Sequence, residues 1–243
     1  MTLPIVYEDD NLFVINKPAG IAVHKVSPTD PQDTIADMLV RERPYLAGVG
    51  DPMKLSDGSF RAGNPLRPGL VHRLDKETSG LMVIAKNQSA FLFLKEQFQK
   101  RLVKKEYLAL VYGRPKELRG TITAPLGKIG TKQTTQLKGR RELVERDAIT
   151  DYATEKSFRD YTLLRVMPQT GRTHQIRVHL KSIGCPIVGD ALYATGKARP
   201  PGLDRMFLHA TTLSFTAPDG KALVLEADLP PELEKVLESL PRP

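Results

Sequence analysis

The sequence has a single cysteine among its 243 residues and no long run of apolar side chains. One cysteine, Cys185, can neither close an intrachain disulfide nor build a thiolate metal cluster, so we expect a reducing, cytoplasmic setting. A transmembrane helix needs about 20 consecutive apolar residues, and the sequence contains no such stretch. Acidic residues at positions 8 to 10 interrupt the N-terminus, so no signal peptide is expected. These features argue against secreted, disulfide-rich and membrane-spanning proteins.

Common catalytic motifs are missing too. The sequence contains no G-x-x-x-x-G-K-[S/T] stretch, which argues against a phosphate-cradling loop, and no G-x-S-x-G nucleophile elbow. His174 and His179 are five positions apart, which is awkward for one helical face and places them on opposite faces of a strand. A metal site is therefore not expected. Hydrolytic glycosidases generally need two carboxylates, and nothing marks Glu77 as a partner for the nearby Asp75.

Positive charge is concentrated in parts of the chain. There are 36 Lys and Arg against 28 Asp and Glu, a formal net charge of +8. Residues 95–141 carry thirteen Lys or Arg and three Glu, and residues 161–189 carry four basic side chains and no acidic one. Residues 1–40 and 203–243 are each net negative. Such charge could simply solvate a surface, but its concentration in two segments favours a polyanionic partner.

The spacing of apolar residues predicts more strands than helices. Strands are predicted within residues 5–20, as a pair around an acidic turn, and at 80–87, 105–113, 160–168, 207–215 and 222–230. Residues 127–147 are expected to form an exposed hairpin or loop, and residues 44–69 a long loop rich in Gly and Pro. In the stretch 105–113, Tyr107, Ala109 and Val111 should point one way and Leu108 and Leu110 the other.

Helical spacing is found at 33–43, 87–103 and 230–240, while 172–180 fits either a helix or a strand. Asp33 is the expected N-cap of the first helix. The second should bury one face, made by Phe91, Leu94, Phe98 and Leu102. Because strands and helices do not alternate strictly, we expect an α+β chain with a mixed, mainly antiparallel sheet, folded as one domain over residues 1–243.

The stretch VHRLDKETSG, residues 71–80, places Asp75 among cations, with His72 and Arg73 before it and Lys76 after it. Neighbouring positive charge favours the ionised carboxylate, so this group suits the role of a nucleophile or anionic base rather than a general acid. The same residues could form a charged turn with local side-chain capping. Chemistry alone leaves both interpretations open.

Four motifs follow one another along the chain: INKPAGIAVH, HRLDKETSGL, KKEYLALVYG and TGRTHQIRVHLKSIGCPIVGD. Together they closely resemble the RNA pseudouridine synthases of the RluA type. The resemblance runs from residue 5 to residue 215 and implies the pseudouridine-synthase fold, in which helices and loops flank the sheet around a central active-site cleft. It implies an isomerase that breaks the C1′–N1 bond of a uridine in folded RNA, turns the uracil and forms a C1′–C5 bond. That reaction adds no water, changes no redox state, and requires no metal or cofactor.

The resemblance also implies catalytic roles. Asp75 would be the essential carboxylate, which either attacks ribose C1′ or removes a proton from C2′ to give a glycal. Tyr107 matches a tyrosine that lies against the uracil and helps the C5 proton leave, although an ordinary core aromatic would look the same. Arg177 matches the arginine that pairs with the catalytic aspartate and would hold its rotamer and charge state, with Arg172 as the nearby alternative. Leu208 matches a hydrophobic pocket wall, for which plain core packing is nearly as good an account.

Further residues are expected to contact RNA. Reaching a stacked base requires extrusion of its nucleotide, and Arg73 matches a residue implicated in filling the space that the base leaves. A simple phosphate contact is the alternative for Arg73. We expect His72 at the same RNA-facing edge, and for His174 a structural or RNA-contacting role is favoured over metal binding. The two basic segments would hold the RNA backbone, so binding should depend strongly on salt.

The resemblance covers a catalytic domain without the small, S4-like N-terminal RNA-binding domain that many ribosomal-RNA members carry. Target recognition would then fall to this domain and its loops, with 44–69 and 127–147 as candidates. We expect a monomeric, cofactor-independent isomerase that acts on structured RNA, with large-subunit ribosomal RNA ahead of transfer RNA. An RNA-binding or ribosome-assembly protein with lost or secondary catalysis is the alternative. A hydrolytic glycosidase on nucleic acid is disfavoured by the missing second carboxylate.

Overall fold

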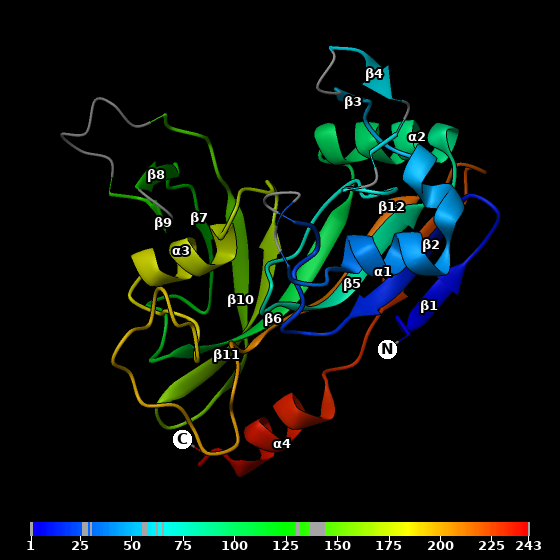
Figure 1. Cartoon of the computed structure of the whole chain (residues 1–243). Helices are drawn as coiled ribbons and strands as arrows, with labels where there is room; N and C mark the ends of the chain where they lie inside the picture. The colour runs from blue at the N-terminus through cyan, green and yellow to red at the C-terminus, as the bar shows by residue number, and fades with distance from the viewer. Residues whose placement is uncertain are drawn as a thin grey trace. The chain divides into compact units, whose positions relative to one another are not determined.

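The computed structural model describes residues 2–25, 29, 31–54, 58–61, 63–64, 66–129, 132–136 and 144–242. The chain forms two compact units. Unit 1 consists of Met1–Val103 and Thr212–Ala227, and unit 2 of Lys104–Thr211 and Asp228–Pro243. Figure 1 shows the helices and strands of both units in the colour order of the chain.

Unit 1 is built around strands that pair with their neighbours in antiparallel fashion. Its strands are β1 (Ile5–Glu8), β2 (Leu12–Lys17), β3 (Met53–Lys54), β4 (Phe60–Arg61), β5 (Ser79–Ala85), the end of β12 (Leu208–Thr216) and β13 (Ala222–Glu226). Its helices are α1 (Ile35–Glu42), the 3-10 helix η1 (Pro44–Gly48) and α2 (Gln88–Gln99). β2 pairs with β1 and β5, β12 with β13, and β3 with β4. β5 is buried along its whole length, which accounts for its continuous apolar run.

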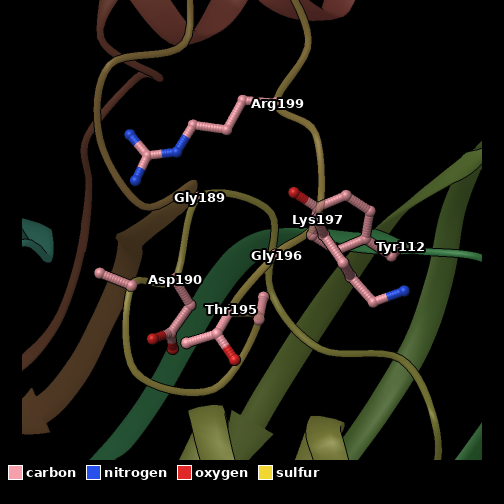
Figure 2. A pocket seen from close by; sticks show the side chains of 9 residues that line it. Tyr112, Gly189, Asp190, Thr195, Gly196, Lys197 and Arg199 are labelled. Atoms are coloured by element: carbon pink, nitrogen blue, oxygen red, sulfur yellow. The ribbon is translucent and has the colours of Figure 1, made fainter.

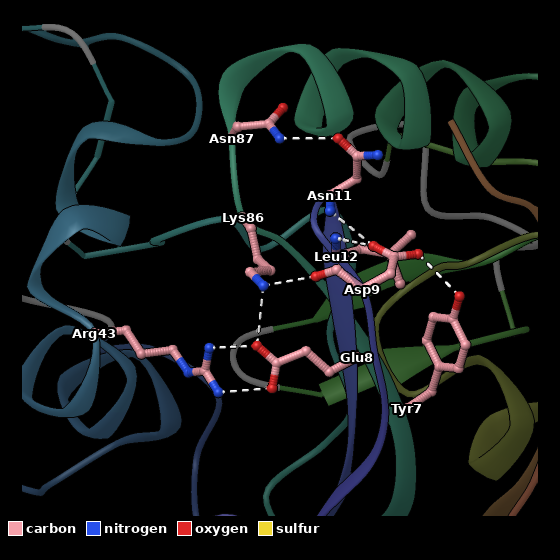
Figure 3. A network of polar contacts seen from close by, with 8 residues as sticks. All are labelled: Tyr7, Glu8, Asp9, Asn11, Leu12, Arg43, Lys86 and Asn87. Atoms are coloured by element: carbon pink, nitrogen blue, oxygen red, sulfur yellow. Dashed lines mark hydrogen bonds and ion pairs between the residues drawn. The ribbon is translucent and has the colours of Figure 1, made fainter. Parts of the chain in front are cut away.

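The acidic turn predicted between the first two strands is a network of polar contacts (Figure 3). Asp9 Oδ1 accepts hydrogen bonds from the backbone N–H groups of Asn11 and Leu12, at 2.7 and 2.8 Å. The Glu8 carboxylate accepts two hydrogen bonds from the Arg43 guanidinium, at 2.6 and 2.9 Å. This contact is the main reason that the pKa of Glu8 is lowered to about 2. The β1–β2 hairpin is thereby fastened to the end of α1.

The first predicted helix forms, but its N-cap prediction was wrong by one residue. α1 begins at Ile35 and is capped by Thr34 rather than Asp33. Thr34 Oγ1 accepts the backbone N–H of Asp37, and the Asp37 carboxylate accepts the backbone N–H of Thr34 at 2.9 Å. This reciprocal capping box satisfies two backbone donors, whereas a cap at Asp33 would satisfy one.

The second predicted helix is shorter than expected. Phe91 and Leu94 are buried as predicted, whereas Leu102 is 59% exposed. The reason is that α2 ends at Gln99, and Arg101 then takes a left-handed backbone conformation with φ of 60°. The helical period therefore does not extend to Leu102.

Unit 2 contains a second set of antiparallel strands with two helices in the described part. Its strands are β6 (Lys104–Tyr112), β7 (Arg119–Ile122), β8 (Gly127–Ile129), β9 (Lys132–Thr134), β10 (Thr150–Ser157), β11 (Tyr161–Pro168) and the start of β12. Its helices are α3 (Gln175–Ser182) and α4 (Pro231–Ser239). The strand order β6–β11–β10–β7 is antiparallel throughout, and β8 pairs with β9. The ambiguous stretch 172–180 is thus helical over most of its length.

The two faces of β6 behave as predicted. On one face, Leu110 joins a buried cluster that includes Leu233 and Val236 of α4. Tyr107 and its neighbours at positions 109 and 111 lie on the opposite face and are also buried. α3 packs against β10 and β11 of the same unit (Figure 1). β6 therefore supports a core on one side while directing Tyr107 to the other.

The two segments expected to be loops contain regular structure. Residues 44–69 include η1 and the β3–β4 hairpin, so the long-loop prediction was wrong there, while residues 55–57, 62 and 65 lie outside the described residues. Residues 127–147 include the β8–β9 hairpin, as expected, while residues 130–131 and 137–143 lie outside the described residues. Their role in target recognition stays a prediction.

The predicted α+β class with a mainly antiparallel sheet is confirmed. The strand pairs given above for the two units are antiparallel, and helices are interspersed among strands without strict alternation. Over the described residues, no helix combines the length and the apolar character that crossing a bilayer would demand.

We expect the chain to unfold in one cooperative transition, as a single domain. The chain passes between the units after residues 103, 211 and 227, and the second passage lies inside one strand, β12. A strand shared in this way couples the melting of its two halves. Differential scanning calorimetry should therefore give equal calorimetric and van't Hoff enthalpies. Two separable transitions would contradict the single-domain prediction.

Candidate functional site

In unit 1, residues 71–78 form an extended loop that ends in a tight turn and runs directly into β5. The backbone carbonyl of Asp75 accepts a hydrogen bond from the N–H of Thr78 at 3.1 Å. Thr78 and Ser79 are buried, whereas the Asp75 side chain is half-buried. The carboxylate therefore stands at the bend before a buried strand, on backbone that is held by a hydrogen bond.

Lys17, the last residue of β2, is fully buried, at 0% exposure. Its ammonium donates to three backbone carbonyls, those of Pro18, Ile21 and Lys76, at 2.7, 2.9 and 3.2 Å. A buried cation is tolerated only when acceptors replace its water. Because Lys76 directly follows Asp75, this ammonium joins the 18–21 segment to the loop that carries the carboxylate. The sequence alone predicts no such role for Lys17.

His72 fixes the same loop on the other side of Asp75. Its Nε2 accepts the backbone N–H of Val83 in β5 at 3.0 Å, so a neutral ring carries its proton on Nδ1. The ring stacks on Phe98 of α2, with centroids 4.6 Å apart and planes inclined by 18°. These contacts give His72 a packing role. The RNA contact expected for it stays a prediction.

Arg73 is exposed and lies close enough to His24 to act on its charge state, as does Arg67. Burial, followed by the positive charges of Arg73 and Arg67, lowers the pKa of His24 to about 4. The imidazole is therefore neutral at physiological pH. Its Nδ1 is buried and finds no hydrogen-bond partner among the described residues. The surroundings of Arg73 are thus positive, as an RNA-contacting surface requires.

We predict that Lys17→Met lowers the free energy of unfolding by roughly 3 kcal/mol, because hydrogen bonds to a buried charge are lost and three carbonyls lose a donor. Urea titration measures this loss. Hydrogen exchange within residues 71–80 should quicken in the variant, since the loop loses one anchor. Lys100→Met, at an exposed lysine of a surface pair with Glu96, is the control and should change neither. A loss under about 1 kcal/mol for Lys17→Met would refute the anchoring role.

In unit 2, Tyr107 and Leu208 are both buried strand residues. Tyr107 is 8% exposed in β6 and lies opposite Val166 of β11. Leu208, the first residue of β12, is 3% exposed and follows Phe207, which belongs to the buried cluster under α4. Both positions are compatible with the roles expected against the uracil. Those roles stay predictions.

Arg177 of α3 forms a buried ion pair with Asp190. Its Nε and Nη2 donate to the two carboxylate oxygens at 2.7 and 2.8 Å. Burial alone would raise the pKa of Asp190, but the Arg177 hydrogen bonds and charge, with two backbone N–H groups, hold it below its ordinary value of 3.8. A guanidinium has five N–H donors and this fork uses two, so Asp190 orients Arg177 without exhausting its donors. The pairing of Arg177 with Asp75 stays a prediction.

A buried polar network holds α3 to β10 and to the turn before the helix. Gln175 Oε1 accepts from Thr170 Oγ1 and from the backbone N–H of Arg172, and its Nε2 donates to Thr150 Oγ1, at 2.7, 3.0 and 2.9 Å. His179 Nδ1 is 2.9 Å from the same Thr150 hydroxyl. His179 is fully buried, so its role here is structural. The network fixes the position of the helix that carries Arg177.

The side chain of Tyr193 gathers contacts from the cationic side chains of α3. The Arg177 guanidinium and the Lys181 ammonium lie 5.0 and 5.7 Å from its ring centroid. Its hydroxyl is 2.9 Å from His174 Nδ1 and accepts the backbone N–H of Gln133 at 3.0 Å. His174 itself takes a left-handed conformation, with φ of 55°, at the start of α3. The structure thus gives His174 a packing role, and an RNA contact stays a prediction.

A small cavity of about 230 Å³ adjoins Asp190 (Figure 2). Its lining residues are Tyr112, Gly189, Asp190, Ala191, Ala194, Thr195, Gly196, Lys197 and Arg199. Lys197 lies over the Tyr112 ring, 5.0 Å from its centroid, while Arg199 donates to the backbone carbonyl of Asp204. Figure 2 shows these two cationic side chains pointing away from each other. The cavity therefore presents no converging set of charges, and we assign it no ligand.

We predict that Asp190→Asn lowers the free energy of unfolding by about 3 kcal/mol, since removing one partner of a buried ion pair leaves the other uncompensated. Because folding depresses the pKa of Asp190, its contribution is complete above pH 3.8 and is lost as pH falls below that value. Urea titrations of both proteins at several pH values measure the difference. Asp160→Asn, at an exposed carboxylate of the same unit, should have little effect. Equal stability of Asp190→Asn and wild type at pH 6 would contradict the prediction.

The structure groups the predicted residues within each unit. His72, Arg73 and Asp75 share one loop of unit 1, while α3 and the segment before it carry Arg172, His174 and Arg177 in unit 2. Arg172 is exposed, with its Nε 3.2 Å from the Asp147 carbonyl, so Arg177 is the buried arginine of the two. The described residues contain no group of three or more His, Cys, Asp or Glu side chains placed to hold a metal ion.

Sequence reasoning missed several of the supporting residues. Asp190 ends the fourth motif, which also contains Arg177, and this shared motif was the only sign in the sequence of a relation between the two residues. Lys17 stands in the first motif beside Pro18, but a lysine in sequence gives no sign of burial. Tyr193 and Gln175 are recognised only from contacts that join distant parts of unit 2.

Comparison with known proteins places this geometry in context. A family model described as RNA pseudouridylate synthase matches residues 11–182. An uncharacterized RNA pseudouridine synthase of Synechocystis is 38% identical over 241 residues, which cover 97% of this chain and 68% of that protein. The ribosomal large subunit pseudouridine synthase D of Vibrio parahaemolyticus is 37% identical over 251 residues, covering 98% and 70%. The chain thus spans about two thirds of the length of these curated relatives.

A solved structure supports the same relationship. The human RNA pseudouridylate synthase domain containing 4 aligns with a TM-score of 0.73 and 28% identity, covering 99% of this chain and 94% of that one. The fold predicted from the four motifs is therefore confirmed.

Proposed function

Because the chain belongs to the RNA pseudouridine synthase family, whose members are RNA isomerases, we propose that it converts specific uridines of structured RNA to pseudouridine. The observation that carries this proposal is the family match over residues 11–182, a range that includes Asp75, Tyr107 and Arg177. Large-subunit ribosomal RNA is the proposed substrate, since relatives 37 and 38% identical to the chain are named as ribosomal large subunit pseudouridine synthases. Transfer RNA is the second candidate.

The proposed reaction rearranges bonds without a net gain or loss of atoms. Asp75 acts as an anion on the ribose, either by attack on C1′ or by removal of the C2′ proton, and the C1′–N1 electron pair leaves with the uracil. After the uracil turns, C5 bonds to C1′ as the Asp75–C1′ bond breaks or, on the glycal route, as the proton returns to C2′. The C5 proton then departs and N1 gains a proton. A carboxylate held on fixed backbone but only half-buried suits this role, because it is oriented and still accessible.

Tyr107 and Arg177 are proposed to complete the reaction site. Tyr107 would lie against the uracil ring and assist the departure of the C5 proton, with Leu208 as an apolar wall. Arg177 would hold the Asp75 carboxylate through donors that the Asp190 fork does not use. Arg177 is preferred to Arg172 because it is buried and already oriented by Asp190, whereas Arg172 is exposed.

RNA binding is proposed to depend on Arg73 and its positive surroundings. Extrusion of a stacked nucleotide costs a few kcal/mol, which contacts to the displaced strand must offset. Arg73 would fill the space left by the base, and the charge of Arg67 would attract the neighbouring phosphates. The neutral ring of His24 would lie beside them. Contacts of this kind release counterions, so affinity should fall steeply with salt.

The decisive variant is Asp75→Asn. We expect it to bind RNA as wild type does and to form pseudouridine at least a thousandfold more slowly, a conservative figure for loss of a catalytic nucleophile or base. Unmodified transcripts of large-subunit ribosomal RNA and of transfer RNAs are incubated with each protein, and pseudouridine is mapped by chemical modification and primer extension. Binding is measured on the same transcripts.

Glu77→Gln is the matched control, since it neutralises the other carboxylate of the same loop and should leave conversion unchanged. Wild-type protein that binds the transcripts but converts none would favour the RNA-binding or ribosome-assembly alternative. Activity lost equally in Glu77→Gln and Asp75→Asn would point to a pair of carboxylates and to glycosidase-like chemistry.

A further inference from the structure

Lys105 lies in β6 two residues before Tyr107, so the two side chains leave the same face of the strand. Residues spaced by two along a strand are about 6.5 Å apart. The Lys105 side chain is half-buried, and its Nζ lies 3.9 Å from the point that a Cβ on Gly171 would occupy. The ammonium therefore rests against the segment that leads into α3.

No residue in the described part of the chain accepts a hydrogen bond from this ammonium or forms an ion pair with it. Burial lowers the pKa of Lys105 to about 8, and no neighbouring acceptor or anion opposes that effect. Lys17 provides the contrast, since its deeper burial is matched by three carbonyl acceptors. A partly desolvated cation without an acceptor is destabilising, and an uncharged side chain of similar length would avoid the penalty.

The space at the Cβ position of Gly171, 3.9 Å from the ammonium, is open. Among the described residues, Lys105 Nζ is the one atom within 4 Å of the Cβ point at Gly171, apart from the glycine and its chain neighbours. Residues 161–189, which include this segment, carry no acidic side chain, so the chain supplies no anion from that stretch. An open position next to a cation that lacks an acceptor is suited to an anionic ligand.

We propose that Lys105 binds the RNA phosphate that adjoins the target uridine and thereby positions that nucleotide on Tyr107. The inference rests on the proposed function, which brings a polyanion and a flipped uracil to this unit. The spacing of the two residues along β6 is comparable to the span between a base and the phosphate of its own nucleotide. Contact with the phosphate offsets the cost of holding the ammonium away from water.

The test compares three variants on an unmodified transcript of complete bacterial large-subunit ribosomal RNA. Lys105→Met removes the charge and should raise the Kd at least tenfold. It should also reduce the slope of log Kd against log salt concentration by about one, as expected for the loss of one phosphate contact. Lys105→Arg keeps a cation and should stay within about threefold of wild type. Lys235→Met makes the same charge change at an exposed lysine of α4, outside both basic segments, and should alter the Kd less than about twofold.

Stability separates this role from a structural one. Lys105→Met should unfold at the same temperature as wild type or higher, because it removes a charge that has no acceptor in the described part of the chain. Replacing a lysine that stabilises the fold would instead lower the Tm. A fall in Tm of several degrees together with an unchanged Kd would overturn the proposal, as would equal Kd values for Lys105→Met and Lys235→Met.

Single-turnover rates at saturating transcript show whether the phosphate bound by Lys105 adjoins the target uridine or lies farther away. Lys105→Met should also convert the uridine at least tenfold more slowly, since a nucleotide that is misplaced on Tyr107 reacts slowly even when bound. A normal rate at saturation would assign Lys105 to a distant phosphate and contradict the proposed position. Lys105→Arg that binds normally but fails to convert would indicate proton transfer instead and overturn the phosphate role.

These outcomes are distinct from failure of the proposed function. Wild-type protein that binds the transcript without forming pseudouridine contradicts the proposed function, and the binding comparison still decides whether Lys105 contacts a phosphate. Wild-type protein that binds neither this transcript nor transcripts of transfer RNAs contradicts both proposals.

Discussion

Hydrogen bonds from the buried ammonium of Lys17 to the carbonyls of Pro18, Ile21 and Lys76 join the Asp75 loop to the segment that follows β2. The loop has little regular secondary structure of its own, so its position depends on contacts with neighbouring elements of unit 1. Lys17 fixes the carbonyl of the residue after Asp75, and His72 fixes the loop on the other side through β5 and α2. A carboxylate with the proposed role, which is to act on one ribose atom, needs this restraint, because small displacements cost large factors in rate. Burying a lysine is the means by which unit 1 provides it.

In unit 2 a buried cation is likewise held by fixed acceptors, in this case the carboxylate of Asp190. Arg177 is buried and paired with Asp190, and the Gln175 network fixes the helix on which it stands. In both units, then, a buried cation is satisfied by fixed acceptors and orients functional groups. Lys105 departs from this pattern, because its half-buried ammonium has no acceptor among the described residues. We attribute this difference to function: Lys17 and Arg177 stabilise the fold, whereas Lys105 is proposed to bind an anionic ligand.

Much of the fold and the central residues were accessible from the sequence, for identifiable reasons. The strict alternation along β6 predicted both faces correctly. Four ordered motifs identified the family, and the catalytic role that they imply for Asp75 stays a prediction. β7 and β10 were not predicted, because residues such as the half-buried Thr154 and the exposed Lys156 carry weak alternation. The Asp190 partnership and the burial of Lys17 depend on contacts between segments far apart in the chain. No local pattern encodes such contacts, and a lysine at position 17 looks like any surface lysine.

The most direct test of the central claim follows the hydrogen on C5 of uridine. A transcript of large-subunit ribosomal RNA is made with uridine tritiated at C5 and incubated with wild-type protein. Isomerisation exchanges this hydrogen with water, so the account predicts release of tritium in a fixed ratio to the pseudouridine formed, with the RNA chain and its bases intact. Abasic sites or free uracil would show hydrolysis instead. Binding without any release of tritium would contradict catalysis altogether.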